Sequence, residues 1–311
     1  MANFTAADIK NLREMTGVGM MDCKKALAAA DGNIDEAVAW LREKGLAAAQ
    51  KKASRIAAEG MSYATVIDGV GVVVEVNAES DFVAKNDVFV SYVKGLADVV
   101  AKENPADLDA LMGMQFPGTG RTVKDEQNDK VLVIGENINA RRFARFADGL
   151  TVPYIHANGK IGVLVNMEVS ENIASSEVVE ELGKDLAMQI AAMNPTYLDK
   201  ADVDADVLAK EKEILMIQAM EENKNAAKPK PENIIEKMVM GRVGKYYEEN
   251  CLLQQAFVKE NKTSCEKHVA EVAKKLGGSI KVNGFVRFAT GEGIEKRQDD
   301  LAAEVAKLVN N

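Results

Sequence analysis

The chain has 311 residues, of which 47% are apolar and 28% charged, and its net charge is −9. This length and balance predict a globular protein of two or three domains, and the negative charge argues against nucleic acid as a direct partner because phosphates would be repelled. Three cysteines without CxxC spacing argue against a disulfide framework and a structural zinc site, and no apolar run is long enough to span a membrane. The first residues lack the apolar stretch of a secretory signal, so we expect a cytoplasmic protein, and no motif predicts a cofactor.

Residues 1–54 are expected to form a small helical module followed by a linker. Three helices are predicted from capping and turn residues: one that begins after Thr5, one over residues 21–30 and one over residues 34–44. Asp31-Gly32 would end the second of these helices, and Gly45 would end the third. Three short helices joined by tight turns are typical of a bundle of the ubiquitin-associated (UBA-like) type.

The next segment is expected to form an α+β unit. Strands over residues 61–67 and 70–76 flank Asp68-Gly69, a dipeptide that strongly favours a hairpin turn. A corner follows, and a helix over residues 88–100 comes after it and ends before an Asn-Pro pair. The unit would therefore be a hairpin covered by one helix.

A later stretch repeats this order of elements. An Asn-Gly turn, the buried strand KIGVLVNMEV, a corner and a long helix follow one another and stop at a second Asn-Pro pair. Residues 71–105 and 162–195 are nearly equal in length, and we interpret them as an internal duplication. Arg141, Arg142 and Arg145 lie between the two copies, where a solvated helix face or internal ion pairs are favoured over contacts with phosphate.

Two helical segments around the turn KPKP predict a hairpin, with a coiled coil as one possibility, and a C-terminal helix is predicted over residues 298–309. The predicted fold class is α+β, with a UBA-like bundle, duplicated core subdomains with small antiparallel sheets, an inserted hairpin and a C-terminal helix. The predicted division comprises the module 1–54, core subdomain N at 55–143, core subdomain C at 144–197 with 233–290, the hairpin 198–232 and a C-terminal helical module at 291–311.

The first corner, residues 80–86, has an aromatic side chain in a polar setting. Phe82 follows Asp81 in the stretch NAESDFVAKN, whereas the second corner, SENIAS, has no aromatic residue. In one interpretation Ser80 or Asp81 caps the helix and the ring folds onto the body of its own domain as a hydrophobic staple. In the other, the ring is an exposed wedge that binds a partner. Because the second copy lacks it, the repeated fold does not require Phe82.

Few other patterns predict chemistry. GEGIEK near the end lacks the third glycine of a dinucleotide fingerprint and is interpreted as a turn. The chain has only two histidines, and His156 is favoured as a turn or packing residue over a general base. Met20 and Met21 cannot both face inward on one helix. The pattern therefore supports an exposed methionine at this turn about as well as methionines that belong to the core. An adaptor that binds through residues 1–54 and a hydrolase that uses carboxylates remain alternatives.

Two longer stretches carry a family resemblance. LREMTGVGMMDCKKAL at residues 12–27 and EVNAESDFVAK at residues 75–85 resemble the two signature regions of the elongation factor Ts family, the guanine-nucleotide exchange factors of bacterial elongation factor Tu. GENI at residues 135–138 and GFVRF…GEGIEK at residues 284–296 are similar as well. The family usually has Thr where this chain has Ser80, and nothing is carried over to the divergent segment 115–129.

The resemblance implies how the first corner would act. Phe82 would insert between helices of the GTPase domain of elongation factor Tu and disturb its magnesium site and phosphate loop. Asp81 would anchor or steer the ring, while Ser80 and Val83 would shape the corner. The chain would bind the GDP-bound and nucleotide-free partner and would carry out no covalent chemistry of its own.

The same resemblance implies further contacts with elongation factor Tu. Arg13 would pair with a carboxylate of the partner, and Met20 would pack on an apolar side chain. His156 is a weaker candidate for the same surface. The hairpin would serve dimerisation, as a homodimer or a 2:2 assembly, and no direct contact with nucleic acid or a membrane is expected.

Overall fold

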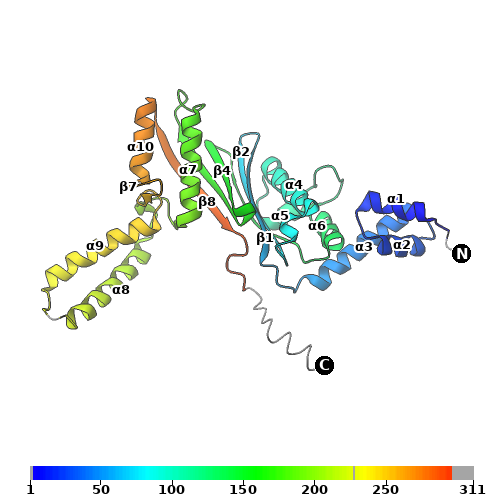
Figure 1. Ribbon diagram of the computed structural model, residues 1–311, viewed down its shortest axis with the longest axis horizontal. Coiled ribbons are helices and arrows are strands. Elements are labelled where there is room, and N and C mark those ends of the chain that lie inside the picture. The colour runs from blue at the N-terminus through cyan, green and yellow to red at the C-terminus, as the bar shows by residue number, and fades with distance from the viewer. Residues whose placement is uncertain (1–2, 227, 296–311) are drawn as a thin grey trace.

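The computed structural model describes residues 3–226 and 228–295 of the chain. Within these residues the protein is α+β, as predicted, with ten α-helices and eight strands in small antiparallel sheets (Figure 1). Figure 1 shows an elongated molecule in which a helical module and a helical hairpin lie at opposite ends of a central layered core. The predicted C-terminal helix, residues 298–309, lies outside the described residues, as does the chain beyond residue 295.

The N-terminal module consists of α1 (Ala6–Thr16), α2 (Met20–Ala29) and α3 (Ile34–Lys52). The Thr5 side chain accepts a hydrogen bond from the Asp8 N–H, and the Asp8 carboxylate accepts one from the Thr5 N–H, which forms a capping box at the start of α1. Leu12 and Leu27 are buried between the helices with other small and apolar side chains. The three predicted helices are therefore present.

The prediction that Gly45 ends the third helix was wrong, because α3 continues through it to Lys52. Gly45 faces α6 (Val123–Ile134), and a Cβ atom at this position would lie 3.3 Å from the carbonyl oxygen of Asn128. The glycine therefore allows two helices to approach closely and does not act as a cap. The predicted linker is therefore helical as far as Lys52.

The core consists of two similar halves. In the first, β1 (Glu59–Ile67), β2 (Val70–Ala78) and β3 (Asn139–Phe146) form an antiparallel sheet against which α4 (Asp87–Glu103) packs. In the second, β4 (Leu150–His156), β5 (Ile161–Val169) and β8 (Ile280–Ala289) form the sheet and α7 (Glu177–Met193) covers it. Both helices have 17 residues and end at an asparagine with positive φ. The predicted repeat of strand, turn, buried strand, corner and helix is thus confirmed.

The two sheets pack face to face, and α4 and α7 cover their outer faces (Figure 1). This layering explains why β2 and β5 are continuous apolar runs, since each is buried on both faces. Gly71 and Gly162 lie at the contact between the sheets. A Cβ atom on Gly71 would lie 2.2 Å from a carbon of Thr151, and one on Gly162 would lie 3.0 Å from the Ser62 carbonyl oxygen. Glycine at both positions lets the sheets approach.

The third strand of the first sheet differs from expectation. Arg141, Arg142 and Arg145 lie on β3 and not on a helix, so the prediction of a solvated helix face was wrong. The alternative, internal ion pairs, is confirmed for Arg141 and Arg142, which both pair with Glu75 on the neighbouring strand β2. The buried carboxylate explains how two adjacent arginines are accommodated beside the core.

The remaining elements connect or extend these halves. Segments outside the repeat are α5 (Leu108–Gly113), α6, the short β6 (Ala256–Phe257) and β7 (Glu260–Ser264), and α10 (Cys265–Leu276). The predicted hairpin consists of α8 (Ala205–Lys224) and α9 (Glu232–Asn250), which pack through Ala219, Ile235 and Val239. The second helix of the hairpin therefore extends well past residue 232, where the predicted hairpin ended. In the described part of the chain, every helix is too short or too polar to cross a membrane.

Candidate functional site

The first corner is a tight turn between strand β2 and helix α4. One turn of 3-10 helix covers Val83–Lys85, and α4 begins at Asp87. The side chain of Asn86 accepts hydrogen bonds from the N–H groups of Val88 and Phe89 at 2.9 and 3.4 Å. The prediction that Ser80 or Asp81 caps this helix was therefore wrong, because Asn86 satisfies the free N–H groups at its start.

The ring of Phe82 points away from the protein's own core. With an exposed fraction of 82%, Phe82 is the most exposed large apolar residue in the described part of the chain. Asp81 beside it is also exposed, whereas Val83 and Ala84 are buried beneath the turn. The hydrophobic staple is thus excluded in this structure, and Val83 is the residue that fixes the corner to the domain below it.

Ser80 connects the corner to the loop between α6 and β3. Its N–H and its hydroxyl donate hydrogen bonds to the two carboxylate oxygens of Glu136, at 2.9 and 2.6 Å. Bonds to an ionised acceptor are stronger than those between neutral groups. An exposed aromatic ring is therefore mounted on a corner that is held from both sides, by buried Val83 and by Glu136.

The residues singled out in the N-terminal module are exposed too. Arg13 lies on α1, and Met20 begins α2 with an exposed fraction of 54%. Met21 is 66% exposed and Met15 60%, so neither residue of the adjacent methionine pair faces inward. Exposed methionines are flexible apolar groups of the kind found at binding surfaces.

His156 belongs to another part of the molecule. It ends β4 in the second sheet, is exposed, and its Nδ1 atom lies 3.1 Å from the hydroxyl of Tyr154. The structure therefore places the candidates on three elements of the fold: the corner between β2 and α4, the N-terminal module, and the end of β4.

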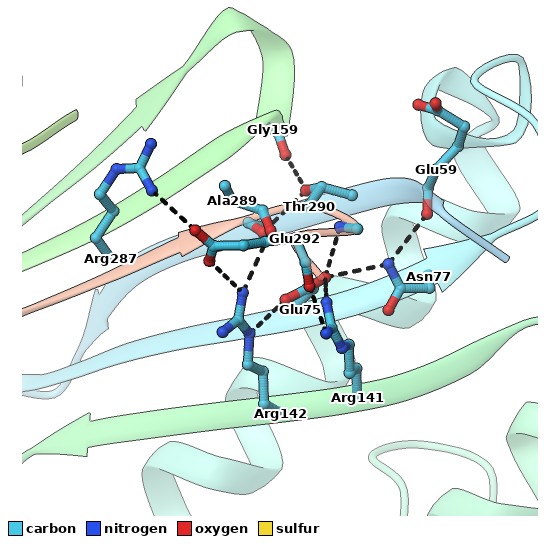
Figure 2. Close-up of polar contacts among 12 residues, drawn as sticks. Glu59, Glu75, Asn77, Arg141, Arg142, Gly159, Arg287, Ala289, Thr290 and Glu292 are labelled. Atoms are coloured by element: carbon cyan, nitrogen blue, oxygen red, sulfur yellow. Dashed lines mark hydrogen bonds and ion pairs between the residues drawn. The ribbon is translucent and has the colours of Figure 1, made fainter. Parts of the chain in front are cut away.

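A buried polar cluster that was not recognised from the sequence lies where the two sheets meet (Figure 2). The Glu75 side chain is fully buried and accepts hydrogen bonds from Asn77 at 3.1 Å, Arg141 at 3.0 Å, Arg142 at 2.5 Å and the N–H of Gly291 at 2.8 Å. We call this arrangement the Glu75 cluster. A glutamate within the apolar run VGVVVEV was the one signal that could have revealed it.

The Glu75 cluster joins the end of β8 to the first sheet. Gly291 has a φ of +74°, and a Cβ atom there would lie 2.0 Å from the carbonyl oxygen of Ala58, so this turn requires glycine. Burial by itself would raise the pKa of Glu75, but the hydrogen bonds from Gly291, Arg142 and Arg141 together outweigh it and hold the pKa below its usual value. Glu75 is therefore a charged partner for both arginines at neutral pH.

The cysteines do not form a reactive centre. Cys23, Cys251 and Cys265 are all buried free thiols, and burial raises the pKa of Cys251 to about 11 and that of Cys265 to about 12. Thiols with such pKa values are protonated at neutral pH and are poor nucleophiles. No group of three or more potential metal ligands occurs among the residues that the structure describes.

Comparison with known proteins gives one consistent family. Residues 79–292 match the family model described as elongation factor TS. An elongation factor Ts of Syntrophotalea carbinolica is 51% identical over 306 residues, and one of Magnetococcus marinus is 49% identical over 307 residues, with 98% of both chains covered in each case. An elongation factor Ts of Rhodospirillum centenum is 48% identical over 315 residues, with 99% of each chain covered.

Proposed function

Because the chain belongs to the elongation factor Ts family, we propose that it is a guanine-nucleotide exchange factor that binds elongation factor Tu and accelerates the release of GDP. In this proposal Phe82 inserts into the GTPase domain near its magnesium and phosphate-binding groups, with Asp81 beside it to steer the ring. The exchange factor then holds the nucleotide-free partner until GTP binds. This function places the protein in the cytoplasm, where translation occurs.

The observation that carries the proposal is the exposed Phe82 ring on an anchored corner. A ring that is 82% exposed contributes little to the stability of its own domain and is available to another protein. The buried Val83 and the Ser80–Glu136 bonds resist movement of the backbone when the ring is pushed against a partner. Such an arrangement suits displacement of groups in a binding site and needs no bond to be made or broken.

Thermodynamic linkage sets what the rest of the chain must supply. A protein that weakens GDP binding must itself bind the nucleotide-free partner more tightly by the same factor. A shift of ~10⁴ requires roughly 5.5 kcal/mol of differential binding, whereas burial of one Phe side chain provides about 1.5–3 kcal/mol. Contacts beyond Phe82 are therefore required, and the exposed N-terminal module supplies one candidate surface.

The function can be tested directly with purified elongation factor Tu loaded with a fluorescent GDP analogue. A small amount of this protein should accelerate release of the analogue into excess unlabelled GDP many times over, and each molecule should act repeatedly. Release at the intrinsic rate in the presence of the protein would overturn the proposal. An unrelated acidic protein at equal concentration controls for charge.

Removal of the N-terminal module tests the second contact surface. We propose that residues 1–54 form a UBA-like bundle that grips the GTPase domain through Arg13 and Met20. Deletion of residues 1–54 should weaken association with nucleotide-free elongation factor Tu by tenfold or more, measured by calorimetry. The matched variant Arg13→Ala, Met20→Ala in the full chain should reproduce a large part of this loss. Unchanged affinity of both proteins would contradict this account.

A further inference from the structure

We propose that Glu136 is a positioning residue for nucleotide exchange that holds the Phe82 corner in its active orientation. This inference rests on the exchange function proposed above. Glu136 accepts hydrogen bonds from the N–H of Ser80 at 2.9 Å and from the Ser80 hydroxyl at 2.6 Å. Because both oxygens are used, the carboxylate fixes the direction of the backbone at Ser80 as well as its position.

A second glutamate makes the reciprocal contact. Glu79 accepts a hydrogen bond from the N–H of Asn137 at 2.6 Å, so that each of two neighbouring strand-end segments offers a carboxylate to the backbone of the other. The two pairs, Glu136 with Ser80 and Glu79 with Asn137, close a ring of hydrogen bonds. A ring of this kind resists rotation of the corner better than either pair alone, because turning the corner must break both.

Arg55 brings a third segment into the same arrangement. Its guanidinium lies 3.3 Å from Glu79, and its carbonyl oxygen accepts a hydrogen bond from the side chain of Asn137 at 2.8 Å. Arg55 follows helix α3, the last helix of the N-terminal module. We call these five residues the corner junction: Arg55, Glu79, Ser80, Glu136 and Asn137. The junction links the module, the Phe82 corner and the loop before β3.

The second copy of the repeat provides an internal comparison. Residues 80–86 read SDFVAKN and residues 170–176 read SENIASS, so Ser80 corresponds to Ser170, Phe82 to Asn172 and Val83 to Ile173. Val83 and Ile173 are both buried, and Asn86 and Ser176 both cap the following helix. The two corners therefore have the same design beneath the surface.

The copies differ in how the corner is anchored. Ser170 exchanges hydrogen bonds with the backbone of Ser279, and the Asn172 side chain donates one to the Gly277 carbonyl oxygen. In the second copy, the residue at the tip is thus bonded to its own domain by neutral groups. In the first copy the tip is a free apolar ring, and a carboxylate clamps the backbone behind it. Hydrogen bonds to an ionised carboxylate are stronger than neutral ones, so they hold the backbone more firmly when a partner presses on the ring.

The test measures the rate and the affinity of exchange separately. At saturating exchange factor, Glu136→Gln should slow release of fluorescent GDP from elongation factor Tu by roughly tenfold, because the neutral amide replaces both charge-assisted bonds from Ser80 with weaker ones and its NH2 group cannot accept from the Ser80 hydroxyl. The half-saturating concentration should change little. Amide hydrogen exchange within residues 79–86 should become faster, which reports the loosened corner without reference to activity.

Variants of Ser80 and its counterpart complete the design. Ser80→Ala should resemble Glu136→Gln, and Ser80→Thr, which keeps the hydroxyl, should retain the parental rate. Ser170→Ala removes a bond at the equivalent corner of the second copy and should leave the saturating rate unchanged. A parental saturating rate for Glu136→Gln, or slower release without faster amide exchange at the corner, would overturn the inference. A parent protein that fails to accelerate release would instead remove the proposed function and this inference with it.

Discussion

Phe82→Ala is expected to slow stimulated GDP release by roughly 10- to 150-fold at saturating protein, the equivalent of the 1.5–3 kcal/mol that burial of one Phe side chain provides. The loss should fall mainly on the rate, because the ring is proposed to act where nucleotide is displaced, and the N-terminal module continues to bind. Since the ring makes little contact with its own domain, the thermal stability of the variant should match that of the parent. Stopped-flow fluorescence gives the rate, and calorimetry gives the affinity.

Two further variants separate the ring from its surroundings. Phe82→Asn gives the first corner the residue that Asn172 provides in the second, and it should be as slow as Phe82→Ala if an apolar ring is what matters. Val258→Ala removes another exposed apolar side chain, in the turn between β6 and β7, and should exchange as fast as the parent. Parental rates for both Phe82 variants would show that the ring is not the wedge.

The sequence predicts best where neighbouring residues decide the structure. Asp68-Gly69 predicts the first hairpin, and both residues have positive φ in the structure, as the tight turn requires. The apolar spacing of α4 and α7 and their asparagine ends likewise depend on local pattern. These features were predicted because each is stabilised within a few residues of the chain.

Prediction failed where residues distant in the sequence decide the outcome. From the sequence alone Gly45 was predicted to end a helix, and only the structure shows α6 packed against it. Likewise, the arginines of the β3 segment fitted a solvated helix face as well as internal ion pairs, and their pairing with Glu75 is visible only in the structure. For Phe82, a staple and a wedge both fit the local sequence, and only the structure, in which Val83 is buried and Phe82 is exposed, excludes the staple. Ser80 was one of two candidate caps for the following helix, but its hydroxyl bonds to Glu136, which lies 56 positions away. Such pairings cannot be predicted from the spacing of residues that are close together in the sequence.

Loss of the Glu75 carboxylate should have the largest effect on stability. Glu75→Gln keeps the shape of the side chain but leaves Arg141 and Arg142 beside a neutral amide, whose NH2 group cannot accept hydrogen bonds. Removing one partner of a buried ion pair costs about 3–5 kcal/mol. We expect urea denaturation to show a loss of this size. Glu180→Gln, which breaks the exposed pair with Lys184, should change the free energy of unfolding by about 0.5 kcal/mol or less.

The effect of Glu75 should also depend on pH with a defined sign. Its pKa in the folded protein is held below the ordinary value of about 4.3 by Gly291 and the two arginines, against the opposing effect of burial. A carboxylate with a lowered pKa stabilises the fold above its ordinary pKa, and the stabilisation is lost as the pH falls through the folded value. The difference between parent and Glu75→Gln should therefore be full at pH 7 and shrink below about pH 4. A difference that stays constant down to pH 3 would mean that the Glu75 charge does not hold the end of β8 to the first sheet.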